Sequence, residues 1–209
     1  MIFNILAFIT GMVAGSLINL YINLPKTNVS FLKWYTGICL RSIKGIIIEM
    51  GLGIIYLMLF GIKGFSLEFA SFCIIITVLL AASLKDIQSK TIPNDLVIFA
   101  LAVGVLMAVL KFSISGIINS LAALLIAGGS LWLVSFFSKG GIGMGDVKLM
   151  GCVGFLLGFE NTVSIMILSV IASGLAGIIM LITKKLDRKS YMPFAPFIFI
   201  GTILAAFLG

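Results

Sequence analysis

The sequence predicts an all-α, polytopic membrane protein, a helix bundle of about eight transmembrane helices. The first reason is composition: 61% of the 209 residues are hydrophobic, 10% are charged and the mean hydropathy is +1.29. Soluble globular domains do not have such values. The second reason is that apolar runs of about 20 residues, enough to cross a bilayer as a helix, recur from end to end. We therefore expect one integral membrane domain over residues 1–209, in contact with lipid.

Eight apolar windows define the expected spans. The first is expected to remain as a span and not to be a cleaved signal peptide, since no charge precedes it. A single helix over residues 147–183 would be about 55 Å long, nearly twice the hydrocarbon thickness, so we divide it at the polar pair Glu160-Asn161. The windows are 2–24, 46–62, 67–84, 96–110, 114–137, 147–159, 162–183 and 194–208.

The basic residues predict the orientation of these spans. Twelve of the 14 Lys and Arg residues lie in or beside the connections that follow spans one, three, five and seven, and only Lys63 and Lys111 lie on the other side. Because Lys and Arg concentrate in cytoplasmic loops, both termini are expected outside. Orientation in the membrane also explains the net charge of +7, so we expect no nucleic-acid partner.

The residue types that are missing exclude several kinds of chemistry. The chain has no histidine, which excludes hydrolases with an imidazole base, zincin motifs and most zinc or haem sites. The three cysteines, Cys39, Cys73 and Cys152, form no Cys-X-X-Cys pair. Neither a zinc ribbon nor a disulfide framework is indicated, and we expect no metal site.

Two of the seven acidic residues stand out by position. Asp86 lies where the third span ends, and Asp146 lies where the sixth begins, after glycines at the alternate positions 141, 143 and 145. Such glycines allow a substrate or a partner helix to approach the backbone closely. Both aspartates map to the cytoplasmic membrane edge. Asp95 is interpreted as a helix-terminal acid that the helix dipole favours.

A pair of carboxyls that face each other at low dielectric cannot both ionise cheaply, so the pair shares one proton. The ionised carboxyl can activate a water while the protonated one polarises a peptide carbonyl, which hydrolyses a peptide without metal or histidine. An acid pair can also relay protons or cations in a small transporter. A relay needs acids embedded in the membrane, whereas Asp86 and Asp146 map to its edge. A noncatalytic membrane protein, in which the acids are incidental, is a third interpretation.

Four segments carry a resemblance to a known family. Residues 143–150 read Gly-Met-Gly-Asp-Val-Lys-Leu-Met, and Asp86 is followed by Ile92-Pro93-Asn94. Residues 193–197 read Pro-Phe-Ala-Pro-Phe, and the first span contains Gly-Ser-Leu-Ile-Asn and ends in Leu-Pro. In this order the segments resemble those of the bacterial type IV prepilin peptidases, prepilin leader peptidase/N-methyltransferases of the Gly-X-Gly-Asp class of intramembrane aspartyl proteases.

The resemblance implies an aspartyl peptidase core over residues 67–208. It implies cleavage of the basic leader that precedes the apolar helix of type IV prepilins or pseudopilins, at the cytoplasmic face of the bacterial cell membrane. It implies that Asp86 and Asp146 are catalytic. The supporting motif residues are Pro93, Asn94, Gly143 and Gly145.

The resemblance also implies that residues 1–62 form a methyltransferase-like part, which methylates the new N-terminus with S-adenosylmethionine. Glu49 matches an acid of the family motif, but the Tyr-Pro pair before it is absent, and the short cytoplasmic loop 25–45 retains only Cys39. Bound zinc is therefore not expected. Glu49 is interpreted either as an interfacial acid paired with Lys44 or Arg41 or as part of a methyl-transfer site, and the residues leave both interpretations open.

Overall fold

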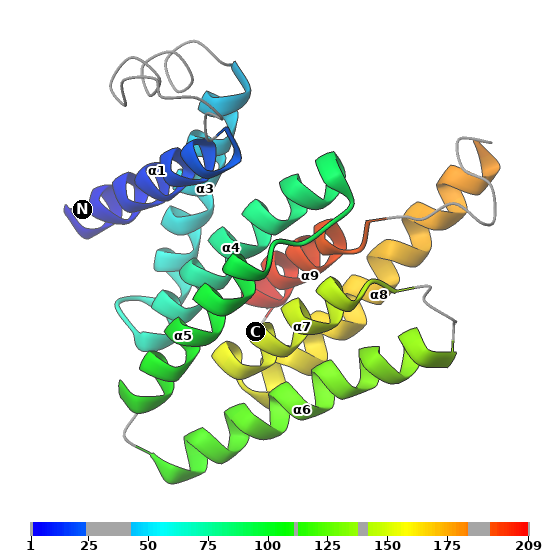
Figure 1. Cartoon of the computed structure of the whole chain (residues 1–209). Coiled ribbons are helices and arrows are strands. Elements are labelled where there is room, and N and C mark those ends of the chain that lie inside the picture. The colour runs from blue at the N-terminus through cyan, green and yellow to red at the C-terminus, as the bar shows by residue number, and fades with distance from the viewer. Residues whose placement is uncertain (1, 24–42, 111–112, 138–141, 184–192, 209) are drawn as a thin grey trace. The chain divides into compact units, whose positions relative to one another are not determined.

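The computed structural model describes residues 2–23, 43–110, 113–137, 142–183 and 193–208 (Figure 1). All regular secondary structure within these ranges is α-helical. The helices are α1 (Ile2–Ile22), α3 (Ile43–Lys63), α4 (Leu67–Ser89), α5 (Asn94–Leu110), α6 (Ile114–Phe137), α7 (Met144–Leu157), α8 (Phe159–Ile182) and α9 (Ala195–Leu208). The predicted all-α helix bundle is confirmed, with one described helix at each of the eight expected spans.

The helices differ in how far they can reach across a membrane. Five of them, α1, α3, α4, α6 and α8, are long and apolar enough to cross a bilayer, and α5 and α9 are apolar but shorter. Helix α7 has 14 residues, which corresponds to about 21 Å against a hydrocarbon thickness of about 30 Å. The chain is a multi-pass membrane protein, and α7 and α9, with 14 residues each, are the shortest of its described helices.

The predicted division of residues 147–183 into two helices is confirmed, but its predicted position at Glu160-Asn161 is wrong. Helix α7 ends at Leu157, and α8 starts at Phe159. Gly158 joins them with φ 81° and ψ 177°, a backbone conformation that residues with a side chain rarely adopt. Glu160 lies in the first turn of α8. The helix dipole favours an acid at this position, so Glu160 stabilises the start of the helix and does not break it.

The chain forms two compact units, Met1–Cys73 and Ile74–Gly209, and the boundary between them along the chain falls within the sequence of α4. In the first unit, α1 packs on α3, and the hydroxyl of Tyr56 donates to the Cys73 carbonyl at 2.7 Å. This unit therefore extends past residue 62, the end of the expected methyltransferase-like part, into the first turns of α4. Most of the expected cytoplasmic loop 25–45, with Cys39, lies outside the described residues.

Helix α7 is the central element of the second unit. It contacts α5, α6, α8 and α9, and Figure 1 shows it among these helices. Eleven of its 14 residues are buried. Neighbouring helices thus cover α7 on nearly every side, and Asp146 in its first turn is held within the bundle.

Candidate active site

Asp86 lies inside a helix rather than after it. The third span was expected to end at residue 84, but α4 continues to Ser89, so Asp86 sits in its last turn. The N–H of Lys90 donates to the Asp86 carbonyl at 2.8 Å, and Lys90 has φ 52°. A left-handed residue with this hydrogen bond is a common way to end a helix. The end of α4 therefore depends on the backbone at Lys90 and not on the first polar residue after the apolar run.

Asp146 is held by the first turn of its own helix. Gly143 is the N-cap of α7, and its carbonyl accepts the Asp146 N–H at 3.0 Å. The N–H of Gly143 donates to the Asp146 carboxyl. A carboxyl at the third helical position that binds back to the N-cap N–H is half of a capping box. The spacing Gly-X-Gly-Asp thus fixes the carboxyl at the helix start, where the helix dipole favours negative charge.

Gly145 lets the connection between α4 and α5 pack against α7. A Cβ built on Gly145 would lie 2.9 Å from the Cβ of Ile92, closer than real side chains approach. Ile92 precedes Pro93 and Asn94, which starts α5. The two motifs that the sequence singled out are therefore in contact through the Ile92 side chain and the bare backbone of Gly145.

The start of α9 faces both carboxyls. The backbone N–H of Ala195 donates to Asp86 and to Asp146, and Ala195 is fully buried. The N–H groups of a first helical turn have no partner within their helix, so this one is available to the carboxyls. Pro196 follows in the same turn and lacks an N–H, which the start of a helix tolerates. The segment Pro-Phe-Ala-Pro thus supplies a backbone donor between two acids.

The two carboxyls line one pocket of about 240 Å³, the aspartate pocket. Asp86 and Asp146 are each only 1% exposed. One oxygen of each, Oδ2 of Asp86 and Oδ1 of Asp146, has no hydrogen-bond partner. Buried polar atoms normally have partners, so these two oxygens are available to a water or a substrate. The other lining residues are Lys90, Thr91, Ile92, Asn94, Gly143, Met144, Gly145 and Lys148.

The environment favours the protonated form of Asp146, which precedes the predicted span 147–159. Burial, and to a smaller extent the nearby charge of Asp86, raise its pKa from 3.8 to about 7. The N–H groups of Gly143 and Ala195 oppose this shift by stabilising the carboxylate. Since burial and a like charge disfavour a second ionisation, the pair is suited to hold one proton near neutral pH.

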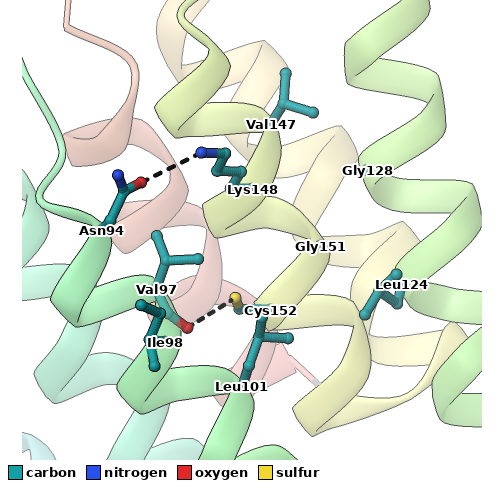
Figure 2. A pocket seen from close by; sticks show the side chains of 10 residues that line it. All are labelled: Asn94, Val97, Ile98, Leu101, Leu124, Gly128, Val147, Lys148, Gly151 and Cys152. Atoms are coloured by element: carbon teal, nitrogen blue, oxygen red, sulfur yellow. Dashed lines mark hydrogen bonds between the residues drawn. The ribbon is translucent and has the colours of Figure 1, made fainter.

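The sequence-predicted motif residues of the second unit gather at this pocket. Asn94, Gly143 and Gly145 line it with the two aspartates, while Pro93 immediately precedes α5. The Nζ of Lys148 donates to Oδ1 of Asn94 at 3.2 Å (Figure 2). Asp95 is exposed in the first turn of α5 and does not line the pocket.

Glu49 lies in the first unit, on α3, and its partners come from α1. Oε1 of Glu49 accepts hydrogen bonds from Oγ of Ser16 at 2.8 Å and from Nδ2 of Asn19 at 3.3 Å. A Cβ on Gly15 would lie 2.6 Å from the Glu49 Cα, so the glycine lets the two helices approach. Of the two basic partners that the sequence suggested, Lys44 forms no ion pair with Glu49 in the described ranges, and Arg41 lies outside them.

The described residues contain no group of three or more His, Cys, Asp or Glu side chains that could hold a metal ion. Three groups at the aspartate pocket were not identified as site candidates from the sequence. The Ala195 N–H is a backbone group, and Lys90 and Lys148 are pocket residues that sequence reasoning counted only as basic loop residues. Only the family-like segment at 193–197 pointed toward Ala195.

The fold and the site define a multi-pass helical membrane protein with a buried pair of carboxyls. Residues 73–182 match the model of the type IV leader peptidase family. The chain belongs to this family, as the motifs predicted, and the match does not support the transporter interpretation.

Three similar proteins all bear the name prepilin leader peptidase/N-methyltransferase. The Bacillus subtilis protein is 32% identical over 70% of this chain and 58% of its own length. The Burkholderia pseudomallei protein is 28% identical over 73% of this chain and 50% of its own length. The Pseudomonas putida protein is 24% identical over 93% of this chain and 70% of its own length. The chain thus spans half to about two thirds of these relatives, and no solved structure matches it.

Proposed function

We propose that this protein is an aspartic endopeptidase that removes the basic leader from type IV prepilins or pseudopilins. The observation that supports this function best is the aspartate pocket, in which two buried carboxyls each keep one oxygen without a partner. The names of the relatives supply the substrate class.

The proposed mechanism uses the two carboxyls in different protonation states. The ionised carboxyl takes a proton from a water, whose oxygen attacks the carbonyl carbon of the scissile peptide bond. The protonated carboxyl gives its proton to the carbonyl oxygen. When the tetrahedral intermediate breaks down, the carboxyl that took the water proton gives it to the leaving nitrogen, and the other carboxyl takes a proton back from a hydroxyl of the intermediate. The C–N bond breaks, an acid and an amine are released, and both carboxyls return to their starting states. The Ala195 N–H stabilises whichever carboxyl carries the negative charge. Because two carboxyls provide both acid and base, the reaction needs no metal.

The proposed site opens at the cytoplasmic face of the bacterial cell membrane. Asp86, Lys90 and Lys148 lie at helix ends near connections that carry most of the basic residues, and such connections stay in the cytoplasm. A basic leader remains on the same side for the same reason. Both termini of the chain are then outside.

The test measures the processing of a coexpressed prepilin by the change in its mobility on a gel. Asp86→Asn and Asp146→Asn are each expected to lower the cleavage rate by at least about 10³-fold, because an amide cannot exchange the proton that the mechanism moves. Asp95→Asn is the matched control, an exposed acid in a first helical turn outside the pocket, and is expected to cleave like the wild type. Full processing by Asp146→Asn would refute the assignment.

A second activity, methylation of the new N-terminus, is favoured by the surroundings of Glu49. Ser16 and Asn19 of α1 hold its carboxylate against α3, and both helices are mostly apolar. A fixed carboxylate fits S-adenosylmethionine, which bears cationic groups and supplies a methyl group when bound. We propose that Glu49 binds this cofactor and that the chain uses no zinc for either activity.

The test of the second activity is intact-mass analysis of the processed pilin made with S-adenosylmethionine present. Glu49→Gln is expected to leave the leader cleaved but the new N-terminus unmethylated, while a chelator changes neither product. Glu68→Gln, an exposed acid paired with Lys63, serves as the control. A wild-type product that never gains a methyl group leaves the chain a peptidase only.

A further inference from the structure

A second cavity lies between α5, α6 and α7 of the second unit, with a volume of about 520 Å³ (Figure 2). We refer to it as the apolar groove. Asn94 and Lys148 line both the groove and the aspartate pocket. The two cavities are therefore adjacent and meet at this hydrogen-bonded pair. The apolar wall residues are Val97, Ile98, Leu101, Leu124, Val147 and Cys152.

The groove extends along one face of α5 and is not a packing defect at one point. Its α5 residues recur at positions 94, 97, 98 and 101, the spacing of one helix face. Opposite them, Gly128 of α6 and Gly151 of α7 line the groove with backbone alone (Figure 2). Ile98 is 65% exposed at its edge. Protein interiors are otherwise close-packed, so an open apolar stripe beside a site is surface available to a ligand.

We propose that the apolar groove binds the apolar helix that follows the cleavage point of the prepilin, an inference that rests on the proposed function. When the scissile bond of a substrate lies at Asp86 and Asp146, the chain after that bond has to leave the aspartate pocket. The groove begins at the edge of this pocket, at Asn94 and Lys148, and offers a path for that chain. Its wall can bury the aliphatic side chains that follow the cleavage point. The groove thus aligns the substrate and favours chains with an apolar segment directly after the cleaved bond.

Charge favours a peptide over a phospholipid as the occupant. A lipid with its acyl chain in the groove would place its phosphate at Lys148, in the same pocket as Asp86 and Asp146. Negative charges at short range and low dielectric repel strongly. A peptide backbone is neutral, and the Lys148 ammonium has three donors, of which Asn94 takes one. The others can bind the carbonyls of a substrate chain.

The first experiment fills the groove. A Cβ on Gly128 would lie 3.7 Å from the Gly151 Cα, an ordinary contact, whereas Gly129 faces open space. Gly128 lines the groove, so Gly128→Leu adds a side chain at its wall, whereas Gly129→Leu makes the same change on the neighbouring residue, which does not line it. We expect Gly128→Leu to slow processing of a full-length prepilin roughly tenfold or more, as when a pair of methylene groups loses its burial. Gly129→Leu is expected to process it like the wild type.

A second experiment does not depend on how Gly128→Leu folds. A photo-crosslinking amino acid is placed at Ile98 in the Asp146→Asn protein with coexpressed prepilin, and at Phe99 in the control, which is also exposed but does not line the groove. A prepilin adduct at position 98 that exceeds the one at 99 supports the proposal. Equal adducts, or lipid adducts alone at position 98, overturn it.

The two proposals fail in different ways. If Gly128→Leu is folded and processes prepilin at the wild-type rate while Asp86→Asn and Asp146→Asn are inactive, the groove inference is wrong and the peptidase function stands. If Asp146→Asn still cleaves, the proposed mechanism itself is wrong. Thermal melting of both leucine variants establishes that each is folded.

Discussion

A buried carboxyl imposes a cost on the folded state that an exposed one does not. Asp146 is held at 1% exposure, with Asp86 nearby and the N–H groups of Gly143 and Ala195 as its partial compensation. The folded protein therefore keeps two buried carboxyls close together, an energetically unfavourable arrangement, at the site where the proposed chemistry needs a proton. Such a site lowers stability in exchange for reactivity.

This cost predicts how Asp146→Asn changes stability with pH. The folded-state pKa of Asp146 is about 7 against an ordinary value of 3.8. Between these values the unfolded carboxyl has lost its proton while the folded one keeps it, so the stability of the wild type falls as pH rises through this window. Asparagine does not ionise. We expect the Tm advantage of Asp146→Asn to grow from pH 4 to pH 7 and then to level off.

The measurement is thermal melting of the purified protein in detergent across this pH range. An Asp146→Asn protein whose Tm relative to the wild type does not rise with pH would contradict the burial argument. The same variant is expected to be inactive, so stability and cleavage move in opposite directions at one residue.

At the scale of elements, the contact between α6 and α7 decides where the first turn of α7 lies. Gly154 of α7 packs directly on the backbone of α6: a Cβ there would lie 2.6 Å from the Ala123 carbonyl oxygen and 2.8 Å from its carbon. Backbone atoms cannot move aside as the end of a side chain can. The short central helix is thus positioned by close backbone contact, and the carboxyl of Asp146 is positioned with it.

Gly154→Ala is therefore expected to destabilise the protein by about 1–3 kcal/mol, the range for overpacked cores. Gly151→Ala is the matched control three residues earlier on the same helix, since its Cβ would meet its nearest neighbour at 3.8 Å. Both substitutions remove a helical glycine and so gain similar helix propensity. Thermal or denaturant unfolding measures the difference, and equal Tm values for the two variants would show that the contact has room to relax.

At the scale of the whole molecule, the orientation in the membrane decides which side receives the substrate. Helix α4 is long and apolar enough to cross the bilayer, and it carries Asp86 in its last turn. The two ends of this one helix therefore report on opposite membrane faces. Ser66, just before the helix, and Gln88, near its end, are both exposed.

We expect Ser66→Cys to react with a membrane-impermeant maleimide in intact cells, and Gln88→Cys to react only after the membrane is permeabilised. The three native cysteines are replaced in both proteins so that the single new thiol is the one labelled. The reverse pattern would place the aspartate pocket outside, and the cytoplasmic leader of the proposed substrate could not reach it.

The sequence by itself determined the helices and the two acids. A bilayer requires about 20 apolar residues for each long span, so hydropathy located every described helix, and α6 has the bounds that its window predicted. The scarcity of acids in an apolar chain made Asp86 and Asp146 conspicuous. Hydropathy could not place the end of α4 or the break at Gly158, because the backbone at Lys90 and Gly158 decides these and not polarity.

The tertiary structure alone decided which groups surround the two acids. It brings the ends of α4, α7 and α9 together, so that residues more than 100 positions apart place an N–H of Ala195 against the carboxyl of Asp86. It also places Lys148 and Asn94 between the aspartate pocket and the apolar groove. No periodicity in the chain marks a backbone donor or an open space, because both arise only when helices distant in sequence pack against one another.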